Sequence, residues 1–304
     1  MKTKIVVGYN ETPSASEAVS WAAHEAEVRA VALHVMVCFE APALSSEASV
    51  AWGMTAEYTV AEAAAWTSAS AIRTALAESH SDLIMSVDVA AGPAPTALLK
   101  GLEPDDLIVV GASGHSSAAA FWTGTTARYL VHHSPCPVVV VRGSASRGAP
   151  DRIVVGVDGS PAADRALRWA GDEADRHGVE LVIVHAWSYP YLPMTTAGTQ
   201  GRDLTRIDAA CTLDRAAELA RERCGIPVTT LLVENSPVTA LVEAAHDGDI
   251  LVVGSRGRGA VRTRLFGSTA NSVLDATAVP IVVVRADPDD EPHDTTNEPH
   301  LAQA

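Results

Sequence analysis

The sequence contains two copies of one pattern, and this internal repeat limits the fold more than any other feature of the chain. Hydrophobic runs, a tryptophan and a glutamate of the first half return in the same order in the second half. Such self-similarity indicates that both halves fold on one structural plan. The matched pairs are 5–8 with 153–156, Trp21-Ala22 with Trp169-Ala170, Glu25 with Glu173, 106–111 with 249–254, and 137–142 with 280–285.

Each half alternates between short runs of Val, Ile and Leu and longer Ala-rich segments, which predicts alternating strands and helices. Several runs are continuously apolar, as is typical of parallel strands covered by helices on both faces. The predicted fold class is therefore α/β, with two tandem doubly wound domains. Strands are predicted at 3–8, 33–39, 82–88, 106–111, 137–142, 151–157, 180–187, 228–234, 249–254 and 280–285, and first-half helices at 13–30, 57–79, 94–103 and 124–133.

The repeat also sets the expected domain boundaries. We expect one domain over residues 1–143, a linker over 144–150, a second domain over 151–286 and a disordered acidic tail over 287–304. The tail contains six acidic residues and no lysine or arginine. A segment of this composition buries too little apolar surface to fold by itself.

Composition excludes several functional classes. The formal net charge of −15 argues against general nucleic-acid binding, which depends on cationic contacts to phosphates. No apolar run approaches the roughly 20 residues of a membrane span, and the first predicted strand leaves no room for a signal peptide. The four cysteines are scattered without a C-x-x-C pair, which favours free thiols over a disulfide framework or a zinc site. We therefore expect a cytoplasmic protein without a protein-ligated metal ion.

A glycine-rich loop follows the fourth predicted strand of each half, with the spacing G-x2-G-x9-G-[ST]. Glycines let backbone N–H groups approach a ligand, and the first turn of a helix offers unpaired donors with partial positive charge. The loop therefore predicts an anion site, most simply for phosphate. Its spacing matches neither the Walker A motif nor the dinucleotide fingerprint. In the second half the candidate residues are Gly254, Ser255, Arg256, Gly257, Arg258, Gly259, Gly267, Ser268 and Thr269.

Four arginines make this second loop positive within an acidic chain, and no Asp or Glu lies between Ile250 and Leu274. The arginines could support a bound phosphate, form a solvated loop, or contact a partner, and the sequence leaves these alternatives open. They are Arg256, Arg258, Arg262 and Arg264.

The first strand of each half should end beside the glycine loop, because open α/β sheets bind ligands where the strand order reverses. In the second half Gly156, Val157 and Asp158 occupy this end, and the Asp158 carboxylate suits a pair of ribose hydroxyls. The first half has Asn10 at the matching position, and an amide binds a hydroxyl without charge assistance. Candidate residues of the first half are Gly8, Asn10, Gly111, Gly114, Gly124, Thr125 and Thr126.

The paired V-V-G strands, the Gly156-Val157-Asp158-Gly159-Ser160 turn and the repeated loop resemble the universal stress proteins in their tandem form, over nearly all of residues 1–286. The resemblance implies five-stranded parallel sheets of order 3-2-1-4-5 and bound ATP, with Mg²⁺ a possible companion of the phosphates. It implies that the second loop holds the phosphates and ribose and that Asp158 lies at the nucleotide. The first loop has no Lys or Arg between Gly111 and Ala127, so we predict weaker ATP binding there.

We expect an ATP-binding regulator of the stress response or growth that acts on an unknown protein partner. The sequence offers no nucleophile–base pair, metal-ligand cluster or carboxylate dyad, so no catalytic residue is assigned. The alternative is an enzyme on the same fold, a slow ATP hydrolase or nucleotidyl transferase, although the H-x-G-H-type motif of such transferases is absent after both first strands. The last strands of the halves could pair within one chain, and a homodimer of tandem chains is a further possibility.

Overall fold

The computed structural model describes residues 3–40, 54–112, 124–142, 149–189, 196–257 and 267–285. Within these residues the strands form one ten-stranded sheet of order β3-β2-β1-β4-β5-β10-β9-β6-β7-β8. Each half therefore contributes a parallel five-stranded unit of order 3-2-1-4-5, as the sequence predicts. The expected tail and most of the expected linker lie outside the described residues.

The elements of the two halves follow each other in the same order. The N-terminal half contains β1 (Lys4–Tyr9), α1 (Pro13–Arg29), β2 (Ala32–Phe39), α2 (Met54–Ser79), β3 (Met85–Ala91), α3 (Ala94–Leu99), β4 (Leu107–Gly111), α4 (Thr125–His133) and β5 (Val138–Val141). The C-terminal half contains β6 (Arg152–Gly156), α5 (Pro161–His177), β7 (Glu180–Trp187), α6 (Thr196–Arg223), β8 (Val228–Glu234), α7 (Pro237–Ala244), β9 (Ile250–Gly254), α8 (Ser268–Ala276) and β10 (Ile281–Val284).

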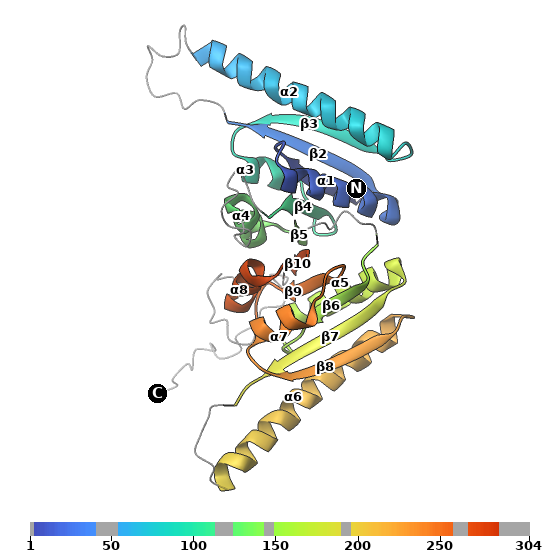
Figure 1. Ribbon diagram of the computed structural model, residues 1–304, viewed down its shortest axis with the longest axis vertical. Helices are drawn as coiled ribbons and strands as arrows, with labels where there is room; N and C mark the ends of the chain where they lie inside the picture. The colour runs from blue at the N-terminus through green and yellow to red at the C-terminus, as the bar shows by residue number, and fades with distance from the viewer. Residues whose placement is uncertain are drawn as a thin grey trace, which may run out of the picture.

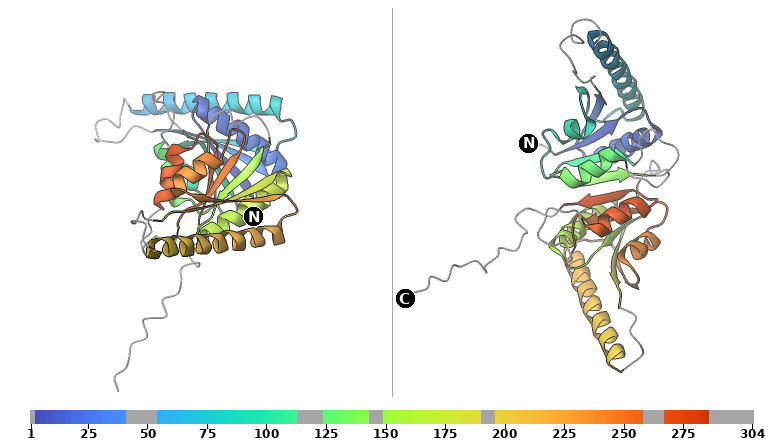
Figure 2. Two further views of the ribbon diagram at one scale, coloured as in Figure 1. Left: turned by 60° about the horizontal axis from the view of Figure 1, so that its bottom comes forward. Right: turned by 90° about the vertical axis from the view of Figure 1, so that its left-hand side faces the viewer.

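Helices cover both faces of the sheet, which explains why the side chains on both faces of its central strands are apolar. One buried cluster packs α1, α2, α5 and α6 against one face, for example through Leu167 of α5. A second cluster packs α3, α4, α7 and α8 against the other face, through residues such as Leu130 and Leu274. Both α2 and α6 lie at the outer ends of the molecule, as Figures 1 and 2 show. No helix of the described part of the chain is long and apolar enough to cross a membrane.

The two halves join where β5 and β10 pair antiparallel at the centre of the sheet (Figure 1). The register places Val139 opposite Val282, and both side chains are fully buried. Across the same junction, Arg128 of α4 donates to Asp275 of α8 at 2.6 Å from Oδ1. The expectation that the last strands pair within one chain is therefore confirmed, and each protects the edge of the other.

Three elements differ from their predicted bounds by three residues or more, and one of them is α2, which begins at Met54 rather than at residue 57. The third strand begins at Met85 rather than at residue 82, because its partner β2 begins at Ala32 and residues 80–83 form a turn closed by Leu83 N–H to His80 O. As a result Ile84 remains exposed despite its apolar character. Helix α3 ends at Leu99 instead of 103, and Gly101 follows in the left-handed region with a φ of 69°.

Candidate functional site

The carboxyl ends of the first and fourth strands of each half lie side by side. Strand β1 pairs with β4, and β6 pairs with β9, so the strand order reverses between them as expected. At each reversal the predicted turn and the first residues of the glycine loop lie at the carboxyl edge of the sheet, the place where open α/β folds bind ligands. We call these two places the N-terminal and C-terminal crevices.

In the C-terminal crevice, the turn after β6 is held by Asp158 and Ser160. The Asp158 Oδ1 atom accepts from Ser160 N–H at 3.0 Å, and the Ser160 hydroxyl caps α5 by accepting from Ala163 N–H at 3.2 Å. Gly159 lies between them with a φ of 74°, in the left-handed region that glycine adopts without steric cost. This turn directs the second carboxylate oxygen of Asp158 toward the glycine loop.

The close approach of Gly257 to Asp158 shows how the turn and the loop come together. A Cβ atom added at Gly257 would lie 2.5 Å from Asp158 Oδ2, so the carboxylate is packed directly against the loop backbone. The Ser160 hydroxyl also reaches Arg256 O at 3.5 Å, and Gly267 lies beside the same backbone. Asp158, Gly257 and the start of α8 therefore share one crevice, as the sequence predicts.

The last glycine of each fourth strand has a packing role. A Cβ at Gly111 would lie 2.5 Å from Ser14 O, and a Cβ at Gly254 would lie 2.8 Å from Ala162 O. Both glycines therefore let the first turn of α1 or α5 cross the end of the strand, which brings the N-terminus of that helix to the crevice. The same absence of a side chain at Gly156 accommodates Leu241 of α7.

Not every predicted main-chain group is directed at a ligand. The amide of Ser255 donates to Val284 O at 2.8 Å, and the amide of Gly267 donates to Ser255 O at 2.9 Å. Val157 is tied to β7, because its amide donates to Val184 O and its carbonyl oxygen lies 2.6 Å from His185 Nδ1. Ser268 and Thr269 occupy the first turn of α8, where amides have no preceding helical carbonyl.

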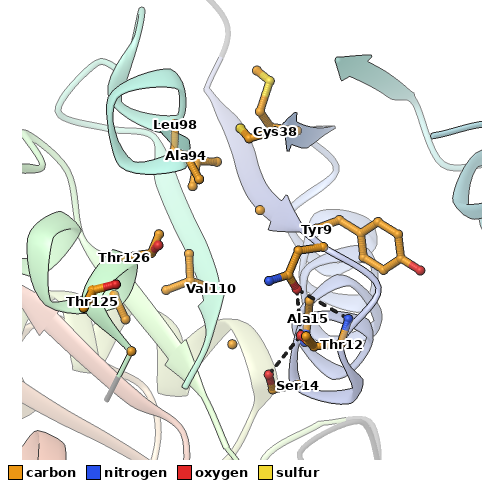
Figure 3. A pocket seen from close by; sticks show the side chains of 16 residues that line it. Tyr9, Thr12, Ser14, Ala15, Cys38, Ala94, Leu98, Val110, Thr125 and Thr126 are labelled. Carbon is orange, nitrogen blue, oxygen red and sulfur yellow. Dashed lines mark hydrogen bonds between the residues drawn. The ribbon is translucent and has the colours of Figure 1, made fainter. Parts of the chain in front are cut away.

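The N-terminal crevice forms a pocket that encloses about 650 Å³, including space open to solvent (Figure 3). The pocket brings together six of the seven residues predicted for this half, and the seventh, Gly114, lies outside the described residues. These six are Gly8, Asn10, Gly111, Gly124, Thr125 and Thr126.

The other wall of this pocket is apolar and was not predicted from the sequence. Met36 and Cys38 project from alternate positions of β2, while Ala94 and Leu98 come from α3 (Figure 3). Burial raises the pKa of the Cys38 thiol to about 11. The signal that could have identified this wall is the period of two along β2, which places residues 36 and 38 on the face covered by α3.

Asn10 holds the turn that Asp158 holds in the second half. Its Oδ1 atom accepts from the Thr12 hydroxyl at 2.7 Å and from Thr12 N–H at 3.4 Å, and Thr12 caps α1. Between them, Glu11 adopts a φ of 61° where the second half has Gly159. The Glu11 carboxylate accepts from Ser68 of α2, on the opposite side of the sheet from the pocket.

Arg258 and Gly259 lie outside the described residues, as do Arg262 and Arg264. The position of Arg256 beside Ser160 is described, and the side chains of its three companion arginines are not. The three readings of the arginine cluster therefore stay open.

An interdomain ion cluster was also missed by the sequence reasoning, although the repeat had paired Glu25 with Glu173. Helices α1 and α5 meet at this point, and both glutamates are almost fully buried. His177 Nε2 lies 3.0 Å from Glu25 Oε2 and 3.3 Å from Glu173 Oε1, while Arg29 donates to Glu173 Oε2 at 2.6 Å and also to Glu25. Arg176 pairs with Glu173 from the rim. The signal that could have revealed the cluster is the repeat, because Glu25 and Glu173 are equivalent residues and lie near the pseudo-twofold axis that relates the two halves.

The cluster strongly perturbs its titratable groups. Burial alone would lower the pKa of His177, but hydrogen bonds and charge interactions with Glu173 and Glu25 raise it to about 9. Burial alone would raise the pKa of Glu173, but the bond to His177 and the charge of Arg29 lower it to about 2. The pKa of Glu25 is raised, mainly by burial. With His177 protonated, two buried cations balance two buried carboxylates.

Comparison with known proteins identifies relatives along nearly the whole chain. Universal stress protein Rv2005c of Mycobacterium tuberculosis (strain ATCC 25618 / H37Rv) is 32% identical over 294 residues, covering 92% of this chain and 96% of the relative. Universal stress protein Rv2623 of the same strain is 29% identical over 302 residues, with the same coverage. A universal stress protein from Archaeoglobus fulgidus DSM 4304 has the same fold, with a TM-score of 0.64 at 20% identity, over 93% of this chain and 98% of that one.

The universal stress protein family model matches twice, over residues 1–142 and 150–285. Each match contains one crevice and one set of five parallel strands. The chain thus belongs to the universal stress protein family, as a tandem of two such domains.

Proposed function

We propose that this protein is a nucleotide-dependent regulator that binds ATP in its C-terminal crevice and acts in the stress response or in growth control. The observation that carries the proposal is the contact between Asp158 and Gly257 at the carboxyl end of the sheet. A carboxylate that can accept hydroxyl hydrogens there lies against Gly257, which has no side chain, in the crevice that also holds the first turn of α8. The Asp158 side of this crevice suits the hydroxyls of a ribose, and the first turn of α8 suits phosphates.

The residues present fit such a ligand. Asp158 would accept hydrogen bonds from the ribose hydroxyls, and the backbone around Gly257 would pass along the phosphates. The amides of Ser268 and Thr269 would donate to phosphate oxygens, with the partial positive charge of the helix terminus behind them. Mg²⁺ would be carried by the phosphates, because the proposed residues supply hydroxyl and amide groups rather than a set of carboxylates.

We propose that binding, rather than turnover, is the output. Bound and free states would differ in the surface offered to a protein partner. The protein would act in the cytoplasm, which is supported by the four cysteines, all of them free thiols. Association of two tandem chains is compatible with this proposal, since the β5–β10 pairing leaves β3 and β8 at the edges of the sheet.

The test begins with protein purified without added nucleotide. Mass spectrometry of the denatured protein should detect ATP or its products, and calorimetric titration of stripped protein should show ATP binding. Gly257→Glu should abolish binding at the C-terminal crevice, since the new side chain would start 2.5 Å from Asp158 Oδ2 and add a second carboxylate. Gly225→Glu, at the opposite edge of the sheet, is the matched control and should bind like the unmodified protein.

Two outcomes would reject the proposal. One is the absence of both retained nucleotide and titratable binding. The other is equal ATP affinity of the two glutamate variants. Hydrolysis of several ATP molecules per second would instead favour the alternative of an enzyme.

A further inference from the structure

A pocket lies between α5, α6 and the turn after β6, and it encloses about 600 Å³, including space open to solvent. Much of its wall is apolar and comes from Val157, Ala216 and Leu219. Apart from Val157, whose amide and carbonyl oxygen are bonded to β7, its lining contains none of the residues proposed to hold a nucleotide. We call this space the α5–α6 pocket.

The repeat shows which residues occupy the corresponding place in the N-terminal half. The hydrogen bond that closes α2 runs from His80 N–H to Leu76 O. The bond that closes α6 runs from Cys224 N–H to Ala220 O. These equivalent ends align the two helices, and the repeated strand and turn align β1 with β6. The pocket residues and their N-terminal counterparts are Val157 and Tyr9, Gly159 and Glu11, Thr212 and Ser68, Arg215 and Ala71, and Ala216 and Ile72.

In the N-terminal half this place is filled by the protein itself. Tyr9 and Ile72 pack against the buried cluster of this face of the sheet. The Glu11 carboxylate accepts from the hydroxyl of Ser68, which is buried. The second half has a smaller residue at each of the three filling positions, namely Val157, Ala216 and Gly159. The α5–α6 pocket is therefore the space that the side chains of a tyrosine, an isoleucine and a glutamate occupy in the other half.

The Glu11 side chain is an internal model for a ligand of the α5–α6 pocket. Glu11 has a φ of 61° and Gly159 has a φ of 74°, so both backbones direct a side chain in the same way. The Glu11 carboxylate reaches a hydroxyl of the long helix α2. In the second half a hydroxyl remains at this place, as Thr212, but the chain supplies no carboxylate at residue 159. A carboxylate from outside the chain can take its position.

The polar groups of the pocket suit such a carboxylate. Among the described residues, Asp164 is the only acceptor of the Arg215 guanidinium, at 3.3 Å from Nη2, so its other N–H groups can bind a ligand. The guanidinium would then join two carboxylates, as Arg29 does in the interdomain ion cluster. The Thr212 hydroxyl donates to Asp208 O at 3.0 Å. Back-bonding of this kind adds little stability to a helix, so the hydroxyl hydrogen can turn toward a ligand.

We propose that the α5–α6 pocket binds a small carboxylic acid with a short alkyl or aryl body. The carboxylate lies between Thr212 and Arg215, and the body lies against the apolar wall. The site exists in the C-terminal half alone, because Glu11 closes its N-terminal counterpart. The proposal does not depend on nucleotide binding, although Gly159 also belongs to the turn that Asp158 holds.

The probe is 3-phenylpropionate, which carries a carboxylate on two methylene groups, as glutamate does, and a ring of the size found in tyrosine. Calorimetric titration of the full chain, stripped of nucleotide, should show one site. Cys211 is exposed and lines the pocket, so its alkylation rate, measured by peptide mass spectrometry, reports occupancy. The acid at ten times its dissociation constant should slow this reaction about tenfold. The neutral 3-phenylpropanamide should bind about tenfold more weakly, because it lacks the charge-assisted hydrogen bonds.

Gly159→Glu should abolish binding, because it restores the carboxylate that closes the N-terminal counterpart, at a backbone conformation that carries glutamate there. Ala216→Ile should also abolish binding by adding the branched side chain of that counterpart, and it leaves the turn unchanged. Arg215→Gln should weaken binding of the acid about fivefold and leave binding of the amide unchanged. Arg223→Gln is the matched control, because Arg223 also joins α6 to α5, through Asp172 at 3.1 Å, but lies outside the pocket.

Absence of both heat of binding and Cys211 protection at ~10 mM acid, which would saturate even a millimolar site, would overturn the proposal. Equal affinity of the unmodified protein for the acid and the amide would overturn it as well. So would unchanged binding to Ala216→Ile with a cooperative thermal melt, which shows that this variant is folded. These results would leave the proposed function intact, because the experiment contains no nucleotide, and ATP binding to the C-terminal crevice is measured separately.

Discussion

The interdomain ion cluster predicts how the stability of the protein depends on pH. His177 faces Glu25, Arg29 and His24 of α1 and Glu173 and Arg176 of its own helix, and only 3% of its side chain is exposed. Its pKa is raised from 6.5 to about 9 in the folded protein. A group with a raised pKa stabilises the fold fully below its unfolded pKa, and this contribution is lost as the pH rises through the folded value.

The size of the effect follows from these two values. A pKa that rises from 6.5 to about 9 corresponds to about 3 kcal/mol of unfolding free energy, at about 1.4 kcal/mol per pKa unit. We expect this amount to be lost between pH 6.5 and pH 9. Glu173, whose pKa is lowered to about 2, contributes on the acid side: its stabilisation is complete above about pH 4.5 and is lost toward pH 2. It therefore does not interfere in the alkaline window.

The measurement is urea unfolding followed by circular dichroism, at intervals from pH 6 to pH 9. His177→Gln keeps a hydrogen-bond donor in the cluster but cannot be protonated. Its unfolding free energy should lie about 3 kcal/mol below that of the unmodified protein at pH 6 and converge with it near pH 9. His246→Gln is the control, because His246 is 69% exposed and lies outside the cluster.

The unfolding free energy of His246→Gln should change with pH as that of the unmodified protein does. A flat profile of the unmodified protein between pH 6.5 and pH 9 would refute the reasoning. Two parallel curves, in which His177→Gln retains the full slope, would refute it equally.

Three further predictions concern the backbone and the junction. Gly254→Ala should lower the unfolding free energy by about 2 kcal/mol in urea, because its Cβ would meet the α5 backbone at 2.8 Å, whereas Gly225→Ala has space to 3.8 Å and should cost less than about 1 kcal/mol. Ala30 and Gly178 both end a helix in the left-handed region. Ala30→Gly should therefore raise the unfolding free energy by about 1 kcal/mol, and Gly178→Ala should lower it by a similar amount. A lower melting temperature for Ala30→Gly or a higher one for Gly178→Ala would contradict this. Val282→Asp should cost more than about 4 kcal/mol by burying a charge in the β5–β10 pair, and a near-native melting temperature would exclude that pairing.

The strand order and the helix positions follow from the sequence because they depend on patterns that are local or repeated. Continuous apolar runs mark the central strands, and the repeat shows that both halves share one topology. The edge strand β3 was misplaced by three residues because its start is set by pairing with β2, which draws in Ala90 and Ala91 despite their weak strand preference. Pairing between strands that are distant in sequence leaves no local signal.

The candidate site was predictable in its turn and loop, and less so in its walls. Motif spacing located Asp158 and Gly257, which the fold brings into contact. It did not show that the Ser255 amide donates to Val284 O of β10, because that hydrogen bond depends on the position of a residue 29 positions later. Nor did it reveal the interdomain ion cluster, since a glutamate on a helix is normally a solvated residue, and only the docking of α1 on α5 buries this one.

Joining the two domains in one chain makes a difference between the crevices possible. In a symmetric homodimer the same residue occupies both copies of every site, so a change that favours one ligand alters both crevices. Here the junction keeps the form of such a dimer, with β5 against β10 and Glu25 near Glu173, but each copy can change alone. His177 stands where the first half has Arg29, and Asn10 stands where the second half has Asp158. The first substitution makes the junction sensitive to pH, and the second replaces a carboxylate with a neutral amide at one of the two turns.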